Sequence, residues 1–316
     1  MAELTATPLT GSSPAADVLI VGPSLGTSVE ALWTRCSAMV PFEVVGWDLP
    51  GHGRSGPAAE AFSVPDLADA VRRLAHAVAG GRDTWYAGVS LGGAVGLELA
   101  LDPGPFGAVA VVASAPKIGD AGAWRERADL VRRKGTEVMV EGSAVRWFAP
   151  GFTAREPAIA GALLTSLSQT DRESYALACE ALASFDLRDR VGARKVPLLI
   201  AAGQHDPVVS PEQARSVAAD AFAVIPGCGH LPPAEDPAAV AELLASFFES
   251  ARCCRVAGQL FQIGQGRRRL GHWPQNLTQR FQGGLNGTVP FSTVGRPPRR
   301  SPGRKCISHP RWPGRR

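Results

Sequence analysis

One segment in the first third of the chain combines a strand, a sharp turn and the start of a helix: Trp85-Tyr86-Ala87-Gly88-Val89-Ser90-Leu91-Gly92-Gly93. The apolar residues before Gly88 are typical of a buried strand, and a helical stretch follows from Leu91 to Leu101. Glycines on both sides of the serine permit a sharp strand-to-helix turn, which lifts its hydroxyl out of the sheet and directs helix N–H groups at an oxyanion. The alternative is a glycine-rich turn without chemistry, so Ser90 needs partners elsewhere in the chain.

The surrounding sequence, from residue 17 to residue 249, alternates short apolar runs with longer amphipathic stretches. The predicted strands are Val18–Val21, Val44–Trp47, Trp85–Gly88, Ala108–Val112, Pro197–Ala202 and Ala221–Ile225. The predicted helices are Asp66–Val78, Leu91–Leu101 and Pro237–Phe248. Strands that alternate with helices indicate an α/β fold with a doubly wound, mostly parallel sheet.

The sequence between Ser114 and about Ala193 has helical periodicity and no strand signal. We therefore predict an inserted helical cap, which can exclude water from a ligand at the carboxyl ends of the strands. The expected organisation is a first core part at residues 1–113, the cap at residues 114–193, a second core part at residues 194–250 and a tail at residues 251–316.

The tail differs from the rest of the chain in charge. Residues 251–316 contain 14 Lys and Arg and no Asp or Glu, which leaves residues 1–250 with a formal net charge of −10. A basic segment rich in Arg, Pro and Gly, with few aliphatic runs, buries too little apolar surface to offset its chain entropy, and we predict that it is disordered. Its abrupt start at Ala251 also suggests a frameshift in a GC-rich gene, a hypothesis that resequencing the gene would test.

Cysteine usage and apolar runs bear on the compartment. The six cysteines form no C-x-x-C pair, no apolar run approaches a membrane span, and the N-terminus lacks a signal-peptide pattern. We expect a cytoplasmic protein that does not enter a membrane. Metal-ligand spacing is absent, so we expect no metal and no cofactor.

Two loops supply the partners that a serine nucleophile requires. Asp206 directly follows the strand that ends at Ala202, and His230 follows the strand that ends at Ile225. An imidazole must take the proton of the serine, and a carboxylate must hold that imidazole. Because the carboxyl ends of parallel strands meet at one edge of the sheet, we expect Ser90, Asp206 and His230 to form a catalytic triad.

Two backbone N–H groups are the candidates for the oxyanion hole. The first belongs to Leu91, directly after the serine, and the second to Leu25 in the turn Gly22-Pro23-Ser24-Leu25-Gly26-Thr27. An ordinary Gly/Pro turn is the alternative for that segment. We expect surface or structural roles for the remaining candidate histidines, His52, His76 and His205.

These motifs resemble the α/β-hydrolase superfamily over residues 17–249, and within it the 3-oxoadipate enol-lactonases of the protocatechuate branch of the β-ketoadipate pathway. The general motifs are Gly22–Ser28, Trp47–Gly53 and Tyr86–Gly93. The cap stretch that is similar to the lactonases comprises Ala115–Gly119, Trp124–Arg127 and Arg146–Phe152. One departure concerns the N-terminus, because such lactonases usually begin with a β-hairpin, whereas residues 1–16 show no strand alternation.

The resemblance implies serine-dependent hydrolysis of 3-oxoadipate enol-lactone to 3-oxoadipate in the catabolism of aromatic compounds. The substrate is a small anionic lactone, so a cation should meet its carboxylate under the cap. Arg127, one helical turn after Trp124, is the candidate for this cation, and we expect Trp124, Arg127 and Trp147 to bind the substrate. The alternative places Arg127 on the surface and Trp124 in the core of the cap.

Three other functions are compatible with parts of the sequence. A general carboxylesterase or a cofactor-free perhydrolase would use the same triad, because fold and triad do not fix the substrate. Nucleic-acid binding through the basic tail is opposed by the negative charge of residues 1–250 and by the few aromatic residues in the tail. A ligand receptor with this fold would not require a complete triad.

Overall fold

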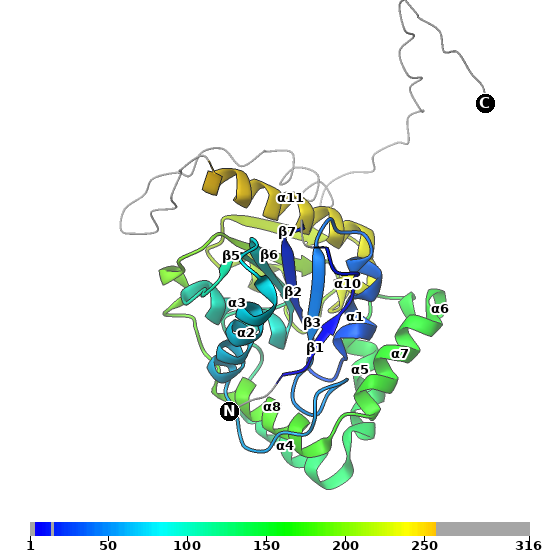
Figure 1. Ribbon diagram of the computed structural model, residues 1–316. Helices are drawn as coiled ribbons and strands as arrows, with labels where there is room; N and C mark the ends of the chain where they lie inside the picture. The colour runs from blue at the N-terminus through cyan, green and yellow to red at the C-terminus, as the bar shows by residue number, and fades with distance from the viewer. Residues whose placement is uncertain (1–3, 14–15, 257–316) are drawn as a thin grey trace, which may run out of the picture. The chain divides into compact units, whose positions relative to one another are not determined.

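The computed structural model describes residues 4–13 and 16–256 of the 316-residue chain. In this part, one seven-stranded sheet has the order β1-β3-β2-β4-β5-β6-β7 (Figure 1). Strand β1 runs antiparallel to β3, and all other neighbours are parallel. The strands are β1 (Ala6–Pro8), β2 (Val18–Gly22), β3 (Glu43–Trp47), β4 (Thr84–Val89), β5 (Phe106–Val112), β6 (Leu198–Gly203) and β7 (Ala221–Ile225).

The predicted α/β fold with a doubly wound, mostly parallel sheet is confirmed, and all six predicted strands are present. Every residue of β2, β4 and β6 is buried, which is typical of parallel strands covered by helices on both faces. The strand order changes direction between β2 and β4, because β3 lies on the other side of β2. The carboxyl ends of β2 and β4 therefore flank the crevice where open α/β sheets bind ligands.

Helices cover both faces of this sheet. Helices α2 and α3 pack against each other on one face, whereas α1 and α11 pack together on the other (Figure 1). The helices outside the cap are α1 (Val29–Ser37), α2 (Val64–Ala79), α3 (Leu91–Leu101), α9 (Pro211–Arg215), α10 (Pro232–Glu235) and α11 (Pro237–Val256). Every residue of α3 is buried, consistent with its composition of Gly, Ala, Val and Leu around a single Glu98.

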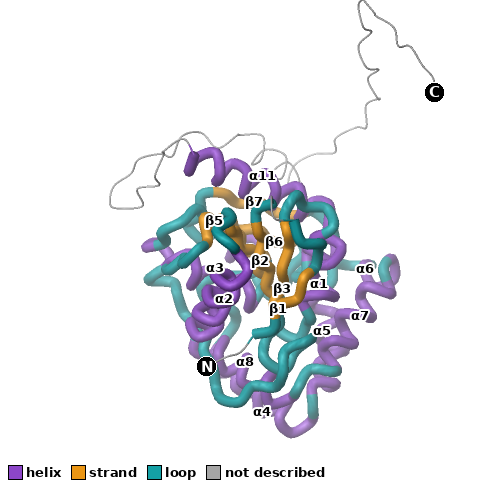
Figure 2. Tube along the Cα trace, viewed as in Figure 1, coloured by secondary structure: helices purple, strands orange, loops and turns teal. Residues whose placement is uncertain are grey.

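A helical segment separates β5 from β6, as expected for the inserted cap. Its helices are α4 (Ala121–Lys134), α5 (Val140–Trp147), α6 (Phe152–Arg155), α7 (Pro157–Ser168) and α8 (Arg172–Ser184), with 3-10 helices η1 (Thr136–Met139) and η2 (Val191–Ala193). Figure 2 shows α4, α5, α7 and α8 grouped around the lower end of the sheet in this view. Helix α4 packs along α8, where Arg132 forms ion pairs with Glu173 and Glu180.

The sequence pattern does not reveal the strand at the start of the core, and the structure corrects the predicted boundary at its end. Residues Ala6–Pro8 form β1, although residues 1–16 show no alternation; three residues on a sheet edge are too short to produce a period-two pattern. Helix α11 continues to Val256, so residues 251–256 belong to the core and not to a disordered tail. Ala251 is fully buried, which explains the extension.

Residues 257–316, which hold most of the basic tail, lie outside the described residues, so disorder of the tail and nucleic-acid binding through it stay predictions. In the described part of the chain, no helix is both long enough and apolar enough to cross a membrane.

Candidate active site

Ser90 lies between β4 and α3 in a strained backbone conformation. Its φ is 53° and its ψ is −111°, a combination that non-glycine residues rarely adopt. The turn is held by the N–H of Ser90, which donates to Val112 O at 2.9 Å. A Cβ at Gly88 would collide with the carbonyl of Gly92, and a Cβ at Gly92 would lie 2.6 Å from Pro23 O. The turn therefore requires both glycines of the predicted motif.

Asp206 and His230 meet at the same edge of the sheet. The Nδ1 atom of His230 lies 2.8 Å from Oδ2 of Asp206, and both side chains are buried. The other carboxylate oxygen accepts from the N–H groups of Val208 at 2.8 Å and Val209 at 3.1 Å. Because the carboxylate can only accept, the imidazole proton is on Nδ1 and Nε2 is left as the basic atom.

The turn after β2 is fastened to the turn that carries Ser90. The N–H of Gly92 donates to Pro23 O at 2.9 Å, and the hydroxyl of Thr27 donates to Ser24 O at 2.9 Å. Leu25 thereby lines the same cavity as Ser90. The N–H of Leu91 is at the first position of α3, where helix N–H groups have no partner within the helix. These are the two donors proposed from the sequence.

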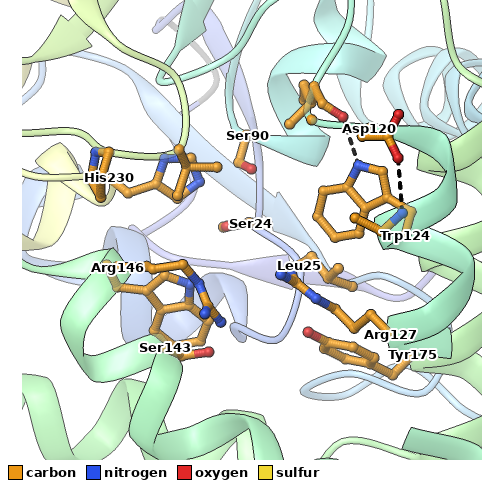
Figure 3. A pocket seen from close by; sticks show the side chains of 16 residues that line it. Ser24, Leu25, Ser90, Asp120, Trp124, Arg127, Ser143, Arg146, Tyr175 and His230 are labelled. Atoms are coloured by element: carbon orange, nitrogen blue, oxygen red, sulfur yellow. Dashed lines mark hydrogen bonds between the residues drawn. The ribbon is translucent and has the colours of Figure 1, made fainter. Parts of the chain in front are cut away.

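A cavity of about 170 Å³ joins this edge of the sheet to the cap. The core contributes polar and apolar groups from the loops after the strands, and the cap contributes aromatic and cationic side chains from α4, α5 and α8. The lining residues include Ser24, Leu25, Ser90, Val208, His230, Trp124, Arg127, Ser143, Arg146, Trp147, Tyr175 and one carboxylate, that of Asp120, which caps α4 by accepting from the N–H groups of Gly122 and Ala123. The structure thus brings Trp124, Arg127 and Trp147, predicted to bind substrate, into one cavity with Ser90 and His230. Figure 3 shows Trp124, Arg127, Ser90 and His230 around this cavity.

Two guanidinium groups enter the cavity from the cap. Figure 3 shows Arg127 and Arg146 reaching toward the same space from opposite sides, below Ser90 and Ser24 in this view. The Cζ atom of Arg127 lies 4.5 Å from the centroid of the Trp124 ring. Within residues 4–13 and 16–256, neither guanidinium forms an ion pair with a carboxylate. Two unneutralised cations favour an anionic group in this space.

The environment shifts the pKa of two of these cap residues. Burial is the main cause that lowers the pKa of Arg146, and repulsion by Arg127 adds to it. Burial raises the pKa of Tyr175, although the two arginines oppose this. Tyr175 therefore remains protonated at neutral pH and can donate its hydroxyl proton to an anion in the cavity.

Arg146, Ser143 and Tyr175 line the cavity but were not among the predicted site residues. The spacing of Ser143 and Arg146, one helical turn apart and just before Trp147, could have indicated a shared face of α5. No sequence signal locates Tyr175, because its position depends on the packing of α8 against α4.

Three further histidines belong to the described part of the chain, and none of them lines this cavity. His76 and His205 are exposed, whereas His52 is buried, with Nδ1 2.9 Å from Pro50 O. Among the described residues, no group of three or more His, Cys, Asp or Glu is placed to hold a metal ion.

Comparison with known proteins places this architecture in a family. Residues 18–243 match the Alpha/beta hydrolase family. The chain is 36% identical over 196 residues to 3-oxoadipate enol-lactonase 2 of Acinetobacter baylyi, and the aligned part covers 61% of this chain and 72% of the relative. It is 29% identical over 242 residues to 3-oxoadipate enol-lactonase 1 of the same organism, covering 74% and 90%. The crystal structure of the enol-lactonase from Burkholderia xenovorans has a TM-score of 0.73 at 28% identity and covers 78% of this chain and 96% of that one. The chain therefore belongs to the alpha/beta hydrolase family.

Proposed function

We propose that this protein hydrolyses 3-oxoadipate enol-lactone to 3-oxoadipate, with Ser90 as the nucleophile. The observation that carries the proposal is a single cavity that holds Ser90 and His230 together with the guanidinium groups of Arg127 and Arg146. Such a cavity suits a carbonyl substrate that also bears a carboxylate. Family membership and the two enol-lactonase relatives support an ester or lactone hydrolase.

In the first half of the reaction, Oγ of Ser90 attacks the ring carbonyl while Nε2 of His230 takes its proton. Asp206 stabilises the resulting imidazolium, and the N–H groups of Leu25 and Leu91 bind the oxyanion. Collapse of the intermediate breaks the ring C–O bond, and the departing enolate takes the proton from His230. The ring-opened molecule stays attached to the serine as an acyl-enzyme.

In the second half, His230 takes a proton from water, which attacks the acyl carbonyl. The ester bond to Ser90 breaks, the serine recovers its proton, and 3-oxoadipate leaves. The substrate carboxylate is held throughout by Arg127 and Arg146, with the hydroxyl of Tyr175 as a further donor. Because these groups lie on the cap and the nucleophile lies on the core, the substrate spans the two.

The direct test is hydrolysis of 3-oxoadipate enol-lactone by the full chain, with Ser90→Ala as the control and a neutral aryl ester as a comparison substrate. We expect Ser90-dependent ring opening with kcat/KM well above that for the ester. Activity on the ester without activity on the lactone would overturn the substrate and leave the serine mechanism in place. Equal activity of Ser90→Ala and the unaltered protein would overturn the mechanism.

A further inference from the structure

Glu235, the last residue of α10, makes contacts on both sides of His230. Its Oε1 atom accepts from the N–H of Gly229 at 2.8 Å and from the N–H of Leu231 at 3.3 Å. Its Oε2 atom accepts from the N–H of Ala149 at 2.7 Å. One carboxylate therefore binds the loop that carries His230 and also a segment that lies 86 residues earlier in the chain.

The segment at Ala149 is the part of the cap that leaves α5. It directly follows Trp147, which lines the cavity and whose carbonyl accepts from the N–H of His230 at 2.9 Å. The two backbones are in close contact, because a Cβ at Gly229 would lie 2.7 Å from Ala149 N and 2.8 Å from Phe148 C. The histidine loop and the end of α5 are thus joined by backbone hydrogen bonding, by close packing and by Glu235.

The carboxylate of Glu235 is partly buried, so other interactions must offset the free-energy cost of removing its charge from water. Burial is the largest influence on its pKa and raises it, while the three N–H donors and the charge of His230 act in the opposite direction. The other ionisable groups that interact with this loop are Asp206, which binds the His230 ring, and Cys228 and Asp236. Hydrogen bonds from N–H groups to an ionised carboxylate are stronger than neutral ones, so they can hold these segments against the cost of burial.

We propose that Glu235 is a positioning residue that locks the loop of His230 to the end of cap helix α5, so that the imidazole and the cavity side chains of α5 keep one geometry. Asp206 orients the ring of His230, whereas Glu235 orients its backbone. The effect on catalysis rests on the proposed hydrolase function, but the mechanical coupling does not.

The test compares Glu235→Gln with the matched variant Glu249→Gln, which changes an exposed glutamate on α11. Glutamine keeps the shape of the side chain, but its amide NH₂ turns a donor toward N–H groups that need an acceptor. In hydrogen exchange of the full chain, we expect the peptides that cover residues 147–151 and 227–232 to exchange roughly tenfold faster or more in Glu235→Gln, and unchanged in Glu249→Gln. Unchanged exchange, or faster exchange in only one of the two peptides, would overturn the coupling.

A second variant acts from the cap side of the contact. Ala149→Pro replaces the N–H that binds Oε2 at 2.7 Å by a ring carbon, so the hydrogen bond is lost and the Glu235 carboxylate is displaced. Phe148, with φ −111° and ψ 143°, already has the extended backbone that proline requires of the preceding residue. We expect faster exchange in residues 227–232, although the substitution is in the cap. Exchange that increases only around residue 149 would contradict the proposal, even if Glu235→Gln fails to fold.

The catalytic consequence is measured with a neutral aryl ester, so that it does not depend on the lactone being the substrate. We expect Glu235→Gln to lower kcat roughly tenfold or more with a smaller change in KM, because a displaced imidazole affects the transition state more than ground-state binding. The acid limb of the kcat/KM profile should also move to lower pH, since a negative charge beside His230 favours its protonated form. Glu235→Asp, which keeps the charge, should restore the position of that limb. A loss of thermal stability with kcat and the pH profile unchanged would mean that Glu235 only supports packing.

Discussion

The two oxygens of the Asp206 carboxylate have different partners, and this predicts what an amide would do there. Oδ1 accepts two backbone N–H groups and Oδ2 faces Nδ1 of His230. In Asp206→Asn, the side-chain oxygen must face the N–H donors, so the NH₂ group turns toward His230. The imidazole would then carry its proton on Nε2 and could not accept one from Ser90.

We therefore expect Asp206→Asn to lower kcat by about 10⁴-fold while the protein stays folded. Initial rates on the lactone and on a neutral aryl ester measure this, and circular dichroism checks the fold. The neighbouring exposed residue offers a control, because His205→Gln should keep full activity. A loss smaller than tenfold in Asp206→Asn would contradict the role assigned to Asp206.

The cap arginines predict a difference between substrates. Removing Arg127 or Arg146 takes away a charged donor for the carboxylate of the lactone but nothing from a neutral ester. We expect Arg127→Ala and Arg146→Ala each to raise KM for the lactone by about ten- to a hundredfold and to change KM for the ester by much less. The control is Arg125→Ala, an exposed arginine on α4. Equal effects on both substrates would remove the arginines from substrate recognition.

At the scale of helices and loops, the loop after β3 connects the core to cap helix α8. Asp48 holds this loop by accepting from the N–H groups of Val29 at 2.7 Å and Arg54 at 2.9 Å. Gly51 O then accepts from the N–H of Asp171 at 3.0 Å, at the start of α8. His52 lies in the same loop and stacks on the Tyr175 ring at 6.2 Å. The loop therefore contacts both the start of α8 and the ring of Tyr175, which lines the cavity.

Burial of His52 predicts how stability depends on pH. Burial lowers the pKa of His52 from 6.5 to about 4, although Pro50 O and the charge of Asp171 oppose this. Between these two pH values the unfolded chain binds a proton that the folded protein does not, so stability falls as pH is lowered through this range. We expect the Tm to fall less steeply between pH 6.5 and pH 4 in His52→Gln than in the unaltered protein. Parallel Tm curves would contradict this account of His52.

At the scale of the whole molecule, the end of α11 contacts the segments just before β2 and β4, which lie far away in the sequence. Arg252 lies 3.4 Å from the carboxylate of Asp17, just before β2, and Arg255 lies 3.3 Å from that of Asp83, just before β4. Arg255 also lies 5.9 Å from the Trp85 ring centroid. These contacts and the burial of Ala251 make the last turns of α11 part of the core.

A chain truncated after Ser250 should therefore be less stable than one truncated after Val256. We expect a Tm difference of at least about 2–4 °C, which corresponds to roughly 1 kcal/mol in a domain of this size. Thermal unfolding of the two truncated chains measures it. Identical values would mean that the core ends at Ser250, as the charge pattern alone suggests.

The sequence by itself determined the parts of this protein that depend on local physics. Apolar runs and turn residues located six strands, and the glycines around Ser90 defined a turn that only small neighbours permit. Ser90, Asp206 and His230 each lie in a loop that follows a predicted strand, and this placement predicted that they meet at one edge of the sheet. These features leave signals within about ten residues of chain, so periodicity and turn chemistry predict them.

Only the tertiary structure decided the rest. The pairing of β1 with β3, the entry of Arg146 and Tyr175 into the cavity, and the extension of α11 to Val256 all depend on partners far away in the sequence. Glu235 is the clearest case, since the Ala149 N–H that it binds comes from another part of the chain. The direction of a side chain on a helix is set by what the helix packs against, and that packing leaves no local pattern in the sequence.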